Sequence, residues 1–155
     1  MENMDLLKQF YLFKDLAASE MKIILKSVKT ESHVAGNEIF SQGESAKALY
    51  IIKKGSIKIQ QTTEKGDAVE VARLGKDSHF GEMSFLDGEA RSATATSLEA
   101  SEVVRIDYDI LSEIIINHPG IAAHFYRQFS IFLCGRLRVT TKDLSFSRSK
   151  ILSHF

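Results

Sequence analysis

The sequence contains one cysteine, one proline and no tryptophan, and none of its apolar runs approaches the roughly 20 residues that a membrane helix needs. A single cysteine, Cys134, excludes an internal disulfide, which is usual for proteins of a reducing compartment. Its neighbours Phe132, Leu133 and Leu137 are apolar, which predicts a buried and unreactive thiol. No early segment combines a basic start, an apolar middle and a cleavage site of small residues. We therefore expect a soluble cytoplasmic protein that is not inserted in a membrane.

Net charge is also absent, because 20 lysines and arginines balance 20 aspartates and glutamates. This balance does not support bulk electrostatic attraction of the chain to nucleic acid or to an anionic membrane. The C-terminal end is locally basic, since residues 136–155 include one acidic residue, Asp143, and five basic ones: Arg136, Arg138, Lys142, Arg148 and Lys150. Such a segment is typical of a solvated helix face. The 155 residues, 44% of them hydrophobic, suit one compact domain with a long helix attached.

The first 108 residues change from a helical to a β pattern. Residues 1–30 are predicted to be helical, with Ser19 as an N-cap before apolar residues at helical spacing: Met21, Ile24, Leu25 and Val28. In residues 31–108, short β-prone runs alternate with glycine turns, as in an all-β sandwich or barrel. The stretch "TEKGDA" predicts a hairpin turn. We expect a mainly β fold with flanking helices, in which about eight strands form a β-barrel or jelly roll.

The remaining residues are predicted to form two helices, separated at Pro119. The first covers residues 109–118 and the second covers residues 120–145, followed by a tail at 146–155. Steps of three and four relate the apolar residues of the second helix: Ile121, Ala122, Phe125, Phe129, Phe132, Leu133, Leu137 and Leu144. At ~1.5 Å per residue this helix would be about 35–40 Å long, more than a domain of this size covers. We expect a symmetric homodimer through this helix; the alternative is a helix that packs entirely on its own barrel.

The stretch "FGEMSFLDGEARSAT", residues 80–94, carries the chemistry of a phosphate site. Gly81 allows close approach of the backbone, and "EMSFL" can form a helical turn whose first amides are unpaired. The planar guanidinium of Arg91 can donate hydrogen bonds to two phosphate oxygens. Ser92 adds a hydroxyl, and the small side chain of Ala93 leaves its amide accessible. Glu82 would repel a phosphate, but it could accept a hydrogen bond from an adjacent ribose hydroxyl. The alternative is that Glu82 and Arg91 simply pair with each other.

This stretch resembles the phosphate-binding cassette of cyclic nucleotide-binding domains. The segments "FYLFKDLAASEM" and "AGNEIFSQGESAKALYIIKKGSIKI" resemble the entry helices and early strands of the same domain. Further on, "CGRLRVTTKDL" resembles the long dimer helix of the bacterial catabolite activator (Crp/Fnr) proteins. The resemblance covers nearly the whole chain and implies the family's fold.

The resemblance also implies roles for single residues. The cyclic phosphate would contact Arg91 and Ser92 together with backbone amides of Gly81, Met83 or Ser84, and Ala93. Glu82 would bind the ribose 2′-hydroxyl. The base would lie among strand residues and two residues of the long helix, one from each subunit: Ile59, Val71, Leu74, Phe80, Thr140 and Thr141. Arg136 matches a helix arginine near the phosphate, and the alternative for the two threonines is ordinary filling of an interface.

One departure from the Crp/Fnr pattern concerns the end of the sequence. Members of that family continue into a helix-turn-helix domain, whereas here "LSFSRSKILSHF" resembles only the start of the helix after the hinge. We expect no direct DNA binding from this chain alone. It would then be a stand-alone sensor that acts on an unknown protein effector, or the sensor half of a longer, truncated regulator.

The leading hypothesis is a non-enzymatic receptor for a cyclic mononucleotide, in which binding moves the long helix. By resemblance, Ser92 and the helix threonines favour cAMP, while cGMP remains possible. A second hypothesis is a metal-dependent enzyme on a similar barrel. No metal site is predicted, however, because no two of the five histidines form a metal-binding pair. These histidines are His33, His79, His118, His124 and His154. A third is a ligand-independent dimerisation or docking module of the same fold.

Overall fold

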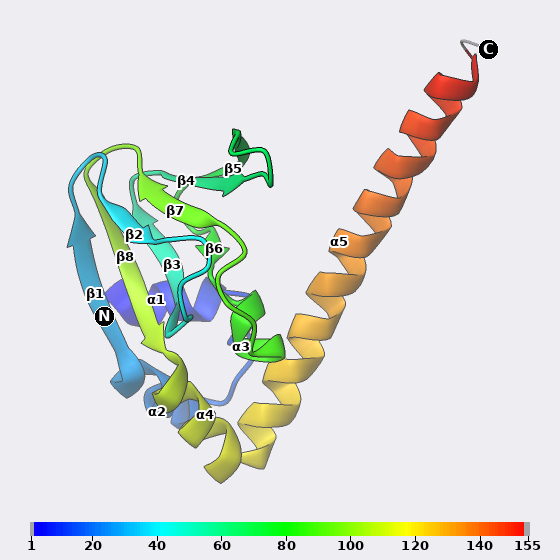
Figure 1. Cartoon of the computed structure of the whole chain (residues 1–155). Helices are drawn as coiled ribbons and strands as arrows, with labels where there is room; N and C mark the ends of the chain where they lie inside the picture. Colours follow the sequence, from blue (N-terminus) through cyan, green and yellow to red (C-terminus); the bar gives the residue numbers. More distant parts are fainter. Residues whose placement is uncertain (1, 154–155) are drawn as a thin grey trace.

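The chain forms two four-stranded antiparallel sheets, helices along one side of them and a long C-terminal helix (Figure 1). The computed structural model describes residues 2–153. In chain order the elements are α1 (Glu2–Gln9), α2 (Ala18–Ser27), β1 (Val28–His33), β2 (Glu38–Phe40), β3 (Ala48–Lys54), β4 (Ile57–Thr62), β5 (Ala68–Leu74), β6 (His79–Phe80), α3 (Met83–Asp87), β7 (Thr94–Ser97), β8 (Ser101–Asp107), α4 (Tyr108–Asn117) and α5 (Pro119–Ser153). The predicted class, mainly β with flanking helices, is confirmed.

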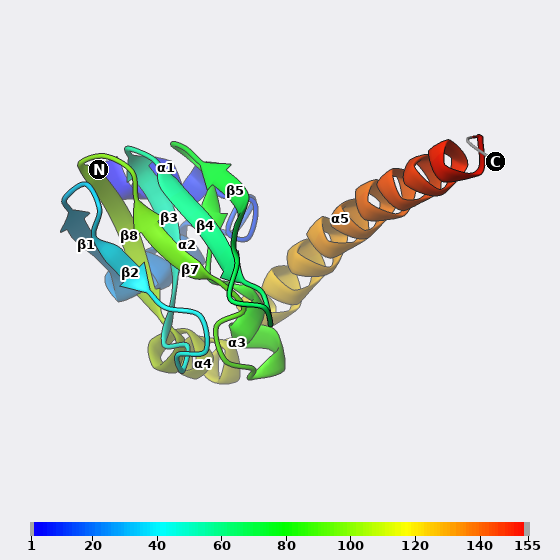
Figure 2. The same cartoon turned by 45° about the horizontal axis from the view of Figure 1, so that its top comes forward.

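The two sheets have the strand orders β1-β8-β3-β6 and β2-β7-β4-β5. The hairpin between β4 and β5 turns at "TEKGDA", as predicted, where the amide of Gly66 donates to the carbonyl of Thr63 at 2.9 Å. Gly66 has a φ of +87°, a conformation that glycine adopts without steric cost. The sheets face each other as a sandwich, and Figure 2 shows them from a second direction.

Strand β3 divides the interior into two cores because its side chains alternate between two faces. Leu49 and Ile51 point to the helices and join a cluster with residues of α1, α2, α4 and α5. Tyr50 and Ile52 point into the sandwich and join the second cluster, which contains Phe80. All four side chains are buried, so the sheet of β3 is covered on both faces.

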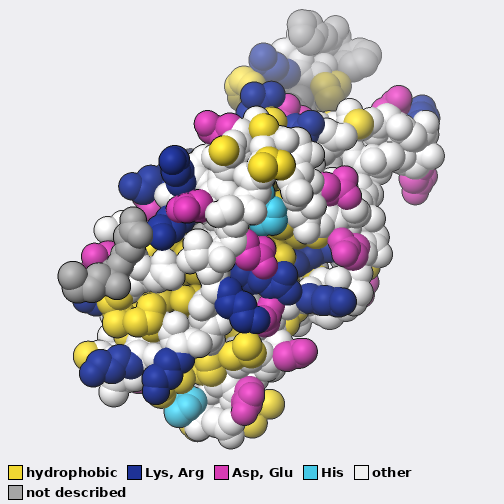
Figure 3. Space-filling model, turned by 90° about the vertical axis from the view of Figure 1, so that its left-hand side faces the viewer, with side chains coloured by type: hydrophobic (Ala, Val, Ile, Leu, Met, Phe, Trp, Pro, Cys, Tyr) yellow, Lys and Arg dark blue, Asp and Glu magenta, His cyan; other side chains and the backbone are white. Residues whose placement is uncertain are grey.

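The outer face of the molecule, near β1 and β8, carries both signs of charge. Lys29 and Arg105 each pair with Asp107, at 2.9 and 2.6 Å, and Arg105 also pairs with Glu31 at 3.3 Å. Figure 3 shows positive and negative side chains interspersed on this face. Mixed charges of this kind do not form a field of one sign.

The N-cap prediction for α2 is wrong, because Ser19 lies inside the helix and Ala17 is the N-cap. Alanine has no side-chain acceptor for the first helical amides. The carboxylate of Glu20 instead accepts a hydrogen bond from the amide of Ala17 at 3.1 Å. This is one half of a capping box, and it satisfies an amide at the start of the helix.

Helix α5 is longer than predicted, since it runs from Pro119 through residues 146–153, where a tail was expected. No proline or glycine interrupts this last stretch, so nothing in the sequence breaks the helix there. His154 and Phe155, also assigned to that tail, lie outside the described residues. At ~1.5 Å per residue, the 35 residues of α5 extend about 50 Å.

The predicted apolar stripe of α5 has two different environments. Ile121, Phe125 and Phe129 are each 1% exposed and pack into the helix-side core. Phe132 is half-buried, and every residue from 133 to 153 is exposed. The alternative of a helix packed entirely on its own barrel is therefore wrong, as the projecting helix in Figure 1 shows. Cys134 is exposed on this projecting part, so the prediction of a buried thiol is also wrong.

Two further features of the described residues concern membranes and metals. No helix among residues 2–153 is long and apolar enough to cross a membrane. Within the same residues, no group of three or more histidine, cysteine, aspartate or glutamate side chains is placed to hold a metal ion.

Candidate functional site

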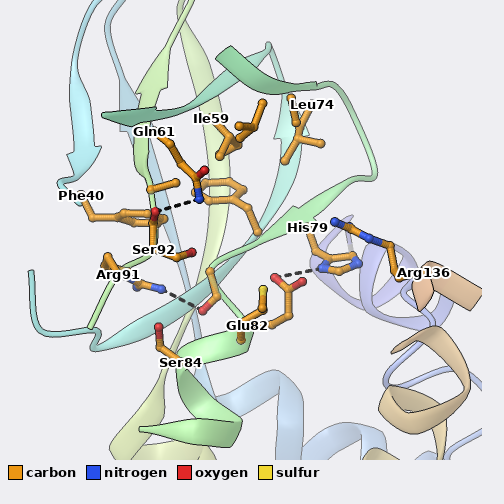
Figure 4. A pocket seen from close by; sticks show the side chains of 16 residues that line it. Phe40, Ile59, Gln61, Leu74, His79, Glu82, Ser84, Arg91, Ser92 and Arg136 are labelled. Carbon is orange, nitrogen blue, oxygen red and sulfur yellow. Dashed lines mark hydrogen bonds and ion pairs between the residues drawn. The ribbon is translucent and has the colours of Figure 1, made fainter. Parts of the chain in front are cut away.

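A cavity of about 330 Å³ lies between β4, β5, β6 and the segment that contains α3 (Figure 4). Its lining consists of Phe40, Ile59, Gln61, Val71, Ala72, Leu74, His79, Phe80, Gly81, Glu82, Met83, Ser84, Arg91, Ser92, Ala93 and Arg136. Every residue predicted for the phosphate, the ribose and the strand side of the base pocket is in this set. The structure therefore brings together residues that are 77 positions apart in the sequence, from Ile59 to Arg136.

Thr140 and Thr141, the two residues predicted to reach the base from the long helix, do not line this cavity. Both are exposed, and their hydroxyls donate to carbonyls of the preceding turn of α5, Arg136 at 3.0 Å and Leu137 at 2.8 Å. They lie on the part of the helix that projects from the barrel. Any contact between these threonines and a ligand in this cavity requires a different position of α5 or a second subunit.

Gly81 connects β6 to α3 in a conformation that suits glycine, with a φ of +80°. A Cβ atom at this position would lie 2.8 Å from Nη1 of Arg91 and 3.2 Å from the carbonyl oxygen of Ala48. The missing side chain of Gly81 therefore leaves the space that the guanidinium occupies. α3 then ends at Gly88, which has a left-handed conformation and whose amide donates to the carbonyl of Ser84 at 3.0 Å.

The guanidinium of Arg91 is buried, with 5% of the residue exposed, and is held by neutral groups. Nη1 donates to the carbonyl of Gly81 at 2.9 Å, and Nη2 donates to the carbonyl of Ala48 at 2.5 Å. The group also lies over the ring of Phe40, at 3.9 Å from its centre. Its Nε atom is buried without a hydrogen-bond partner in the described part of the chain. The contacts fix the orientation of Arg91 and use three of its five N–H donors, including one to Tyr108 described below.

Tyr108 and Gln61 support this side of the cavity from neighbouring elements. The hydroxyl of Tyr108 donates to the same carbonyl of Gly81 and accepts from Nη1 of Arg91 at 3.3 Å. On the other side, Nε2 of Gln61 donates to the carbonyl of Ser92 at 3.1 Å and so ties the segment after Arg91 to β4.

Glu82 has 8% of its surface exposed, and its partner is His79 rather than Arg91. Nδ1 of His79 lies 3.3 Å from Oε2 of Glu82, an ion-pair distance, although the two groups are not aligned as a hydrogen bond. Burial acts to raise the pKa of Glu82, but His79 and, more weakly, Arg136 outweigh it and hold that pKa below its ordinary value of 4.5. Glu82 is therefore a charged acceptor at neutral pH. The alternative in which Glu82 and Arg91 pair with each other is wrong.

Four residues of the lining are not among those predicted from the sequence: Phe40, Gln61, Ala72 and His79. Phe40 comes from β2, some 50 positions before the Arg91 it stacks on, and nothing local in the sequence marks that contact. His79 lies three positions before Glu82 in the sequence, and this spacing is a signal for a place beside the carboxylate.

Comparison with known proteins places this cavity in a family. Residues 30–118 match the family described as "Cyclic nucleotide-binding domain". The chain belongs to this family. The match includes all of the cavity's lining except Arg136, which lies on α5.

Individual relatives agree with this assignment and differ in their ligands. The chain is 32% identical over 133 residues to the cyclic AMP receptor protein of Thermus thermophilus, covering 86% of this chain and 60% of that protein. It is 27% identical over 136 residues to cyclic GMP-binding protein C of Dictyostelium discoideum, covering 88% of this chain and 5% of that protein. The chain thus spans about three fifths of the bacterial relative and a small part of the other.

A solved structure of the same bacterial family supports the fold. The Thermus thermophilus catabolite activator protein superposes with a TM-score of 0.74 at 30% identity, covering 88% of this chain and 62% of that one. The jelly-roll sandwich followed by a long helix is therefore the fold of a cyclic nucleotide-binding domain of the Crp-like type, a type of binding domain found in transcription regulators.

Proposed function

We propose that the chain is a non-enzymatic receptor for cAMP, in which nucleotide binding changes the position of α5. The observation that carries this proposal is the separation of two buried charges in one cavity. Arg91 is held by carbonyls, and Glu82 is held by His79, so neither charge neutralises the other. A ligand that carries an anionic phosphate beside a sugar hydroxyl matches this arrangement.

The phosphate is proposed to lie beside Arg91. The guanidinium of Arg91, the hydroxyl of Ser92 and the backbone around Gly81 and Ala93 provide donors on this side of the cavity. Met83 and Ser84, at the start of α3, contribute further amides. Because the pocket contains one buried arginine, it suits a single phosphate of low charge better than a di- or triphosphate.

The ribose is proposed to lie beside Glu82, and the base among Ile59, Val71, Leu74 and Phe80. Oε2 of Glu82 faces His79, which leaves Oε1 to accept a hydrogen bond from the 2′-hydroxyl. Figure 4 shows Arg91 and Ser92 on one side of the cavity, with Glu82 and His79 on the other. Arg136 lies beside His79 and adds positive charge at the rim.

A symmetric homodimer through α5 is proposed for the assembly. Its support is the row of exposed apolar side chains at seven-residue spacing on one face of the projecting helix: Leu137, Leu144 and Ile151. In such a dimer, Thr140 and Thr141 would reach the base of one or both ligands and favour adenine over guanine. The partner that receives the signal is proposed to be a transcription regulator's output domain or a protein effector.

Calorimetric titration with cAMP and cGMP tests the proposal, and Arg91→Ala tests the phosphate site. We expect micromolar cAMP binding to the wild type and at least a tenfold weaker affinity in Arg91→Ala, because a charge-assisted contact is lost. Arg105→Ala is the matched control, since Arg105 pairs with Glu31 and Asp107 away from the cavity. A change of less than threefold in the cAMP affinity of Arg91→Ala refutes the phosphate assignment.

If the wild type binds neither cAMP nor cGMP, the result would instead favour the ligand-independent docking module.

The ribose assignment has its own test. Glu82→Ala is expected to weaken cAMP by about tenfold and to change the affinity for 2′-deoxy-cAMP by less than twofold, because the deoxy ligand lacks the hydroxyl that Glu82 would bind. Isothermal titration of both ligands to both proteins gives the four affinities. Equal losses for the two ligands would contradict the ribose role.

A further inference from the structure

His79 lies between the candidate ribose subsite and the long helix. Its Nδ1 faces Glu82 at 3.3 Å, while its ring contacts three aromatic rings: Phe10 with centres 5.3 Å apart, Tyr11 at 5.0 Å and Phe132 at 4.9 Å. Phe10, Tyr11, His79 and Phe132 are called the His79 cluster below. Phe132 belongs to α5, and its ring also stacks on Tyr11 at 4.8 Å. One side chain of β6 therefore contacts a buried carboxylate of the cavity and a residue of the helix.

The His79 cluster is placed where α5 leaves the barrel. Phe132 is the last residue of α5, within the described chain, that is not exposed, since residues 133–153 are all exposed. One turn further, the guanidinium of Arg136 lies 5.8 Å from the centre of the Phe132 ring and lines the cavity. The position of α5 between Phe132 and Arg136 therefore sets the direction of the exposed part of the helix that follows.

The contact between His79 and Glu82 is adjustable. The two groups are at ion-pair distance but not aligned as a hydrogen bond, and the side chains are 12% and 11% exposed. A ligand hydroxyl that binds Oε1 of Glu82 would engage the same carboxylate whose Oε2 faces His79, so a small adjustment of the carboxylate on binding would alter that contact. An imidazole that is mostly buried and packed against three rings has little room to follow without moving one of them.

We propose that His79 positions Glu82 for the ligand and couples occupancy of that subsite to the docking of α5 at Phe132. This inference rests on the proposed cyclic nucleotide function and names the residue through which its binding site and long helix communicate. The coupling is reciprocal, because a ligand that shifts the helix must bind differently when the helix is shifted by other means.

Two variants of His79 separate its two contacts. His79→Phe keeps an aromatic ring for the His79 cluster and removes the group that faces Glu82. His79→Asn keeps a donor near the position of Nδ1 and removes the ring. Both are compared with the wild type in the full chain, and thermal unfolding confirms that each variant is folded.

The first measurement is the ratio of the dissociation constants for 2′-deoxy-cAMP and cAMP. We expect His79→Phe to reduce this ratio about fivefold or more, towards that of Glu82→Ala, and His79→Asn to keep it within about twofold of the wild type. An equal loss of affinity for both ligands, or an unchanged ratio in His79→Phe, would overturn the positioning role. A purely structural role would not distinguish the two ligands.

The second measurement is hydrogen exchange of the amides of residues 129–136 with and without cAMP. We expect cAMP to change exchange there in the wild type and in neither variant, since each variant lacks one of the two contacts. We also expect His79→Asn to raise exchange in the same residues without any nucleotide, because Phe132 loses a packing partner. The coupling would be overturned if cAMP did not change the hydrogen exchange of these α5 amides in the wild type. It would also be overturned if cAMP changed their exchange in the variants as it does in the wild type.

The outcomes distinguish this inference from the proposed function. If the wild type binds cAMP with a preference over 2′-deoxy-cAMP while the His79 variants behave like it, only the inference fails. If the wild type binds neither nucleotide, the proposed function fails and the coupling fails with it.

Discussion

At the scale of single residues, Gly81 and Arg91 depend on each other. Gly81 provides a left-handed backbone that places its carbonyl on Nη1 of Arg91, and its lack of a side chain leaves room for the same guanidinium. Phe40 and Ala48 complete the surroundings of Arg91 from two other strands. The arginine is therefore oriented before any ligand arrives, which lowers the entropic cost of binding.

Gly81→Ala and Gly88→Ala test this dependence as a matched pair. Both glycines have positive φ, so each variant is expected to lose about 1–2 kcal/mol of stability from backbone strain. Only at Gly81 would the new Cβ meet a side chain, since nothing lies within 4 Å of the corresponding position at Gly88. We expect cAMP affinity to fall at least tenfold in Gly81→Ala and less than threefold in Gly88→Ala, as measured by calorimetry. Similar affinities in the two variants would contradict the account.

Glu82 leads to a prediction about pH. Its pKa is lowered in the folded state. Burial raises this pKa, but His79, a backbone hydrogen bond and Arg136 together outweigh burial. Tyr11 and Tyr108 are the tyrosines whose own pKa values Glu82 affects. A carboxylate with a lowered pKa contributes stability that is present above its unfolded value and is lost as the pH falls through its folded value. The stability of the wild type relative to Glu82→Gln should therefore be greatest above pH 4.5 and shrink below it.

Urea unfolding of both proteins at about pH 6 and about pH 3 measures this difference. His79→Phe provides the control, because it removes the group with the largest effect in lowering the pKa of Glu82, and the difference at pH 6 should be smaller. A difference that does not change between the two pH values would contradict the assignment of a charged Glu82.

The sequence predicted the contiguous part of the site better than the rest. Gly81, Glu82, Arg91 and Ser92 lie within a dozen positions, so their chemistry can be assessed together without knowledge of strand order. Phe40 and Gln61 reach the same cavity only because β2, β7 and β4 are neighbours in one sheet, and pairing between distant strands is not encoded in any local pattern. The partner of Glu82 is different, because His79 lies only three positions before it, and this local spacing could have indicated the contact.

At the scale of elements, α5 has a docked part and a projecting part. Helical periodicity predicted the apolar stripe that both parts share, because the spacing of apolar residues is a local property. Periodicity could not show which residues meet the barrel, since that depends on where the helix leaves the sheets. The same limit explains the errors at Cys134 and at the end of the helix, where no residue marks the change from buried to exposed.

Phe129→Ala and Leu137→Ala compare the two parts of α5. Phe129 is 1% exposed, so its truncation should lower the free energy of unfolding by about 3–5 kcal/mol. Leu137 is 67% exposed, and its truncation should change the stability of a dilute monomer by less than about 0.5 kcal/mol. Urea denaturation at low protein concentration measures both. A large loss in Leu137→Ala under these conditions would show that this side chain is buried within one subunit.

At the scale of the whole molecule, the projecting helix exposes apolar side chains that a monomer leaves in water. Patches of this kind usually mark an interaction surface. Sedimentation equilibrium over a range of concentrations should show a monomer–dimer equilibrium, and a double substitution of Leu137 and Leu144 by Ser should shift it to monomer. A wild type that is monomeric at all concentrations would contradict the proposed homodimer.

The central claim is that one cavity recognises a cyclic phosphate through Arg91 and a ribose hydroxyl through Glu82. The measurement that tests it most directly is calorimetric titration of the wild type, Arg91→Ala and Glu82→Ala with cAMP and 2′-deoxy-cAMP. We expect Arg91→Ala to weaken the binding of both ligands by at least about tenfold, and Glu82→Ala to weaken the binding of cAMP alone. A wild type that binds both ligands equally, or an Arg91→Ala variant that binds them as well as the wild type does, would contradict it.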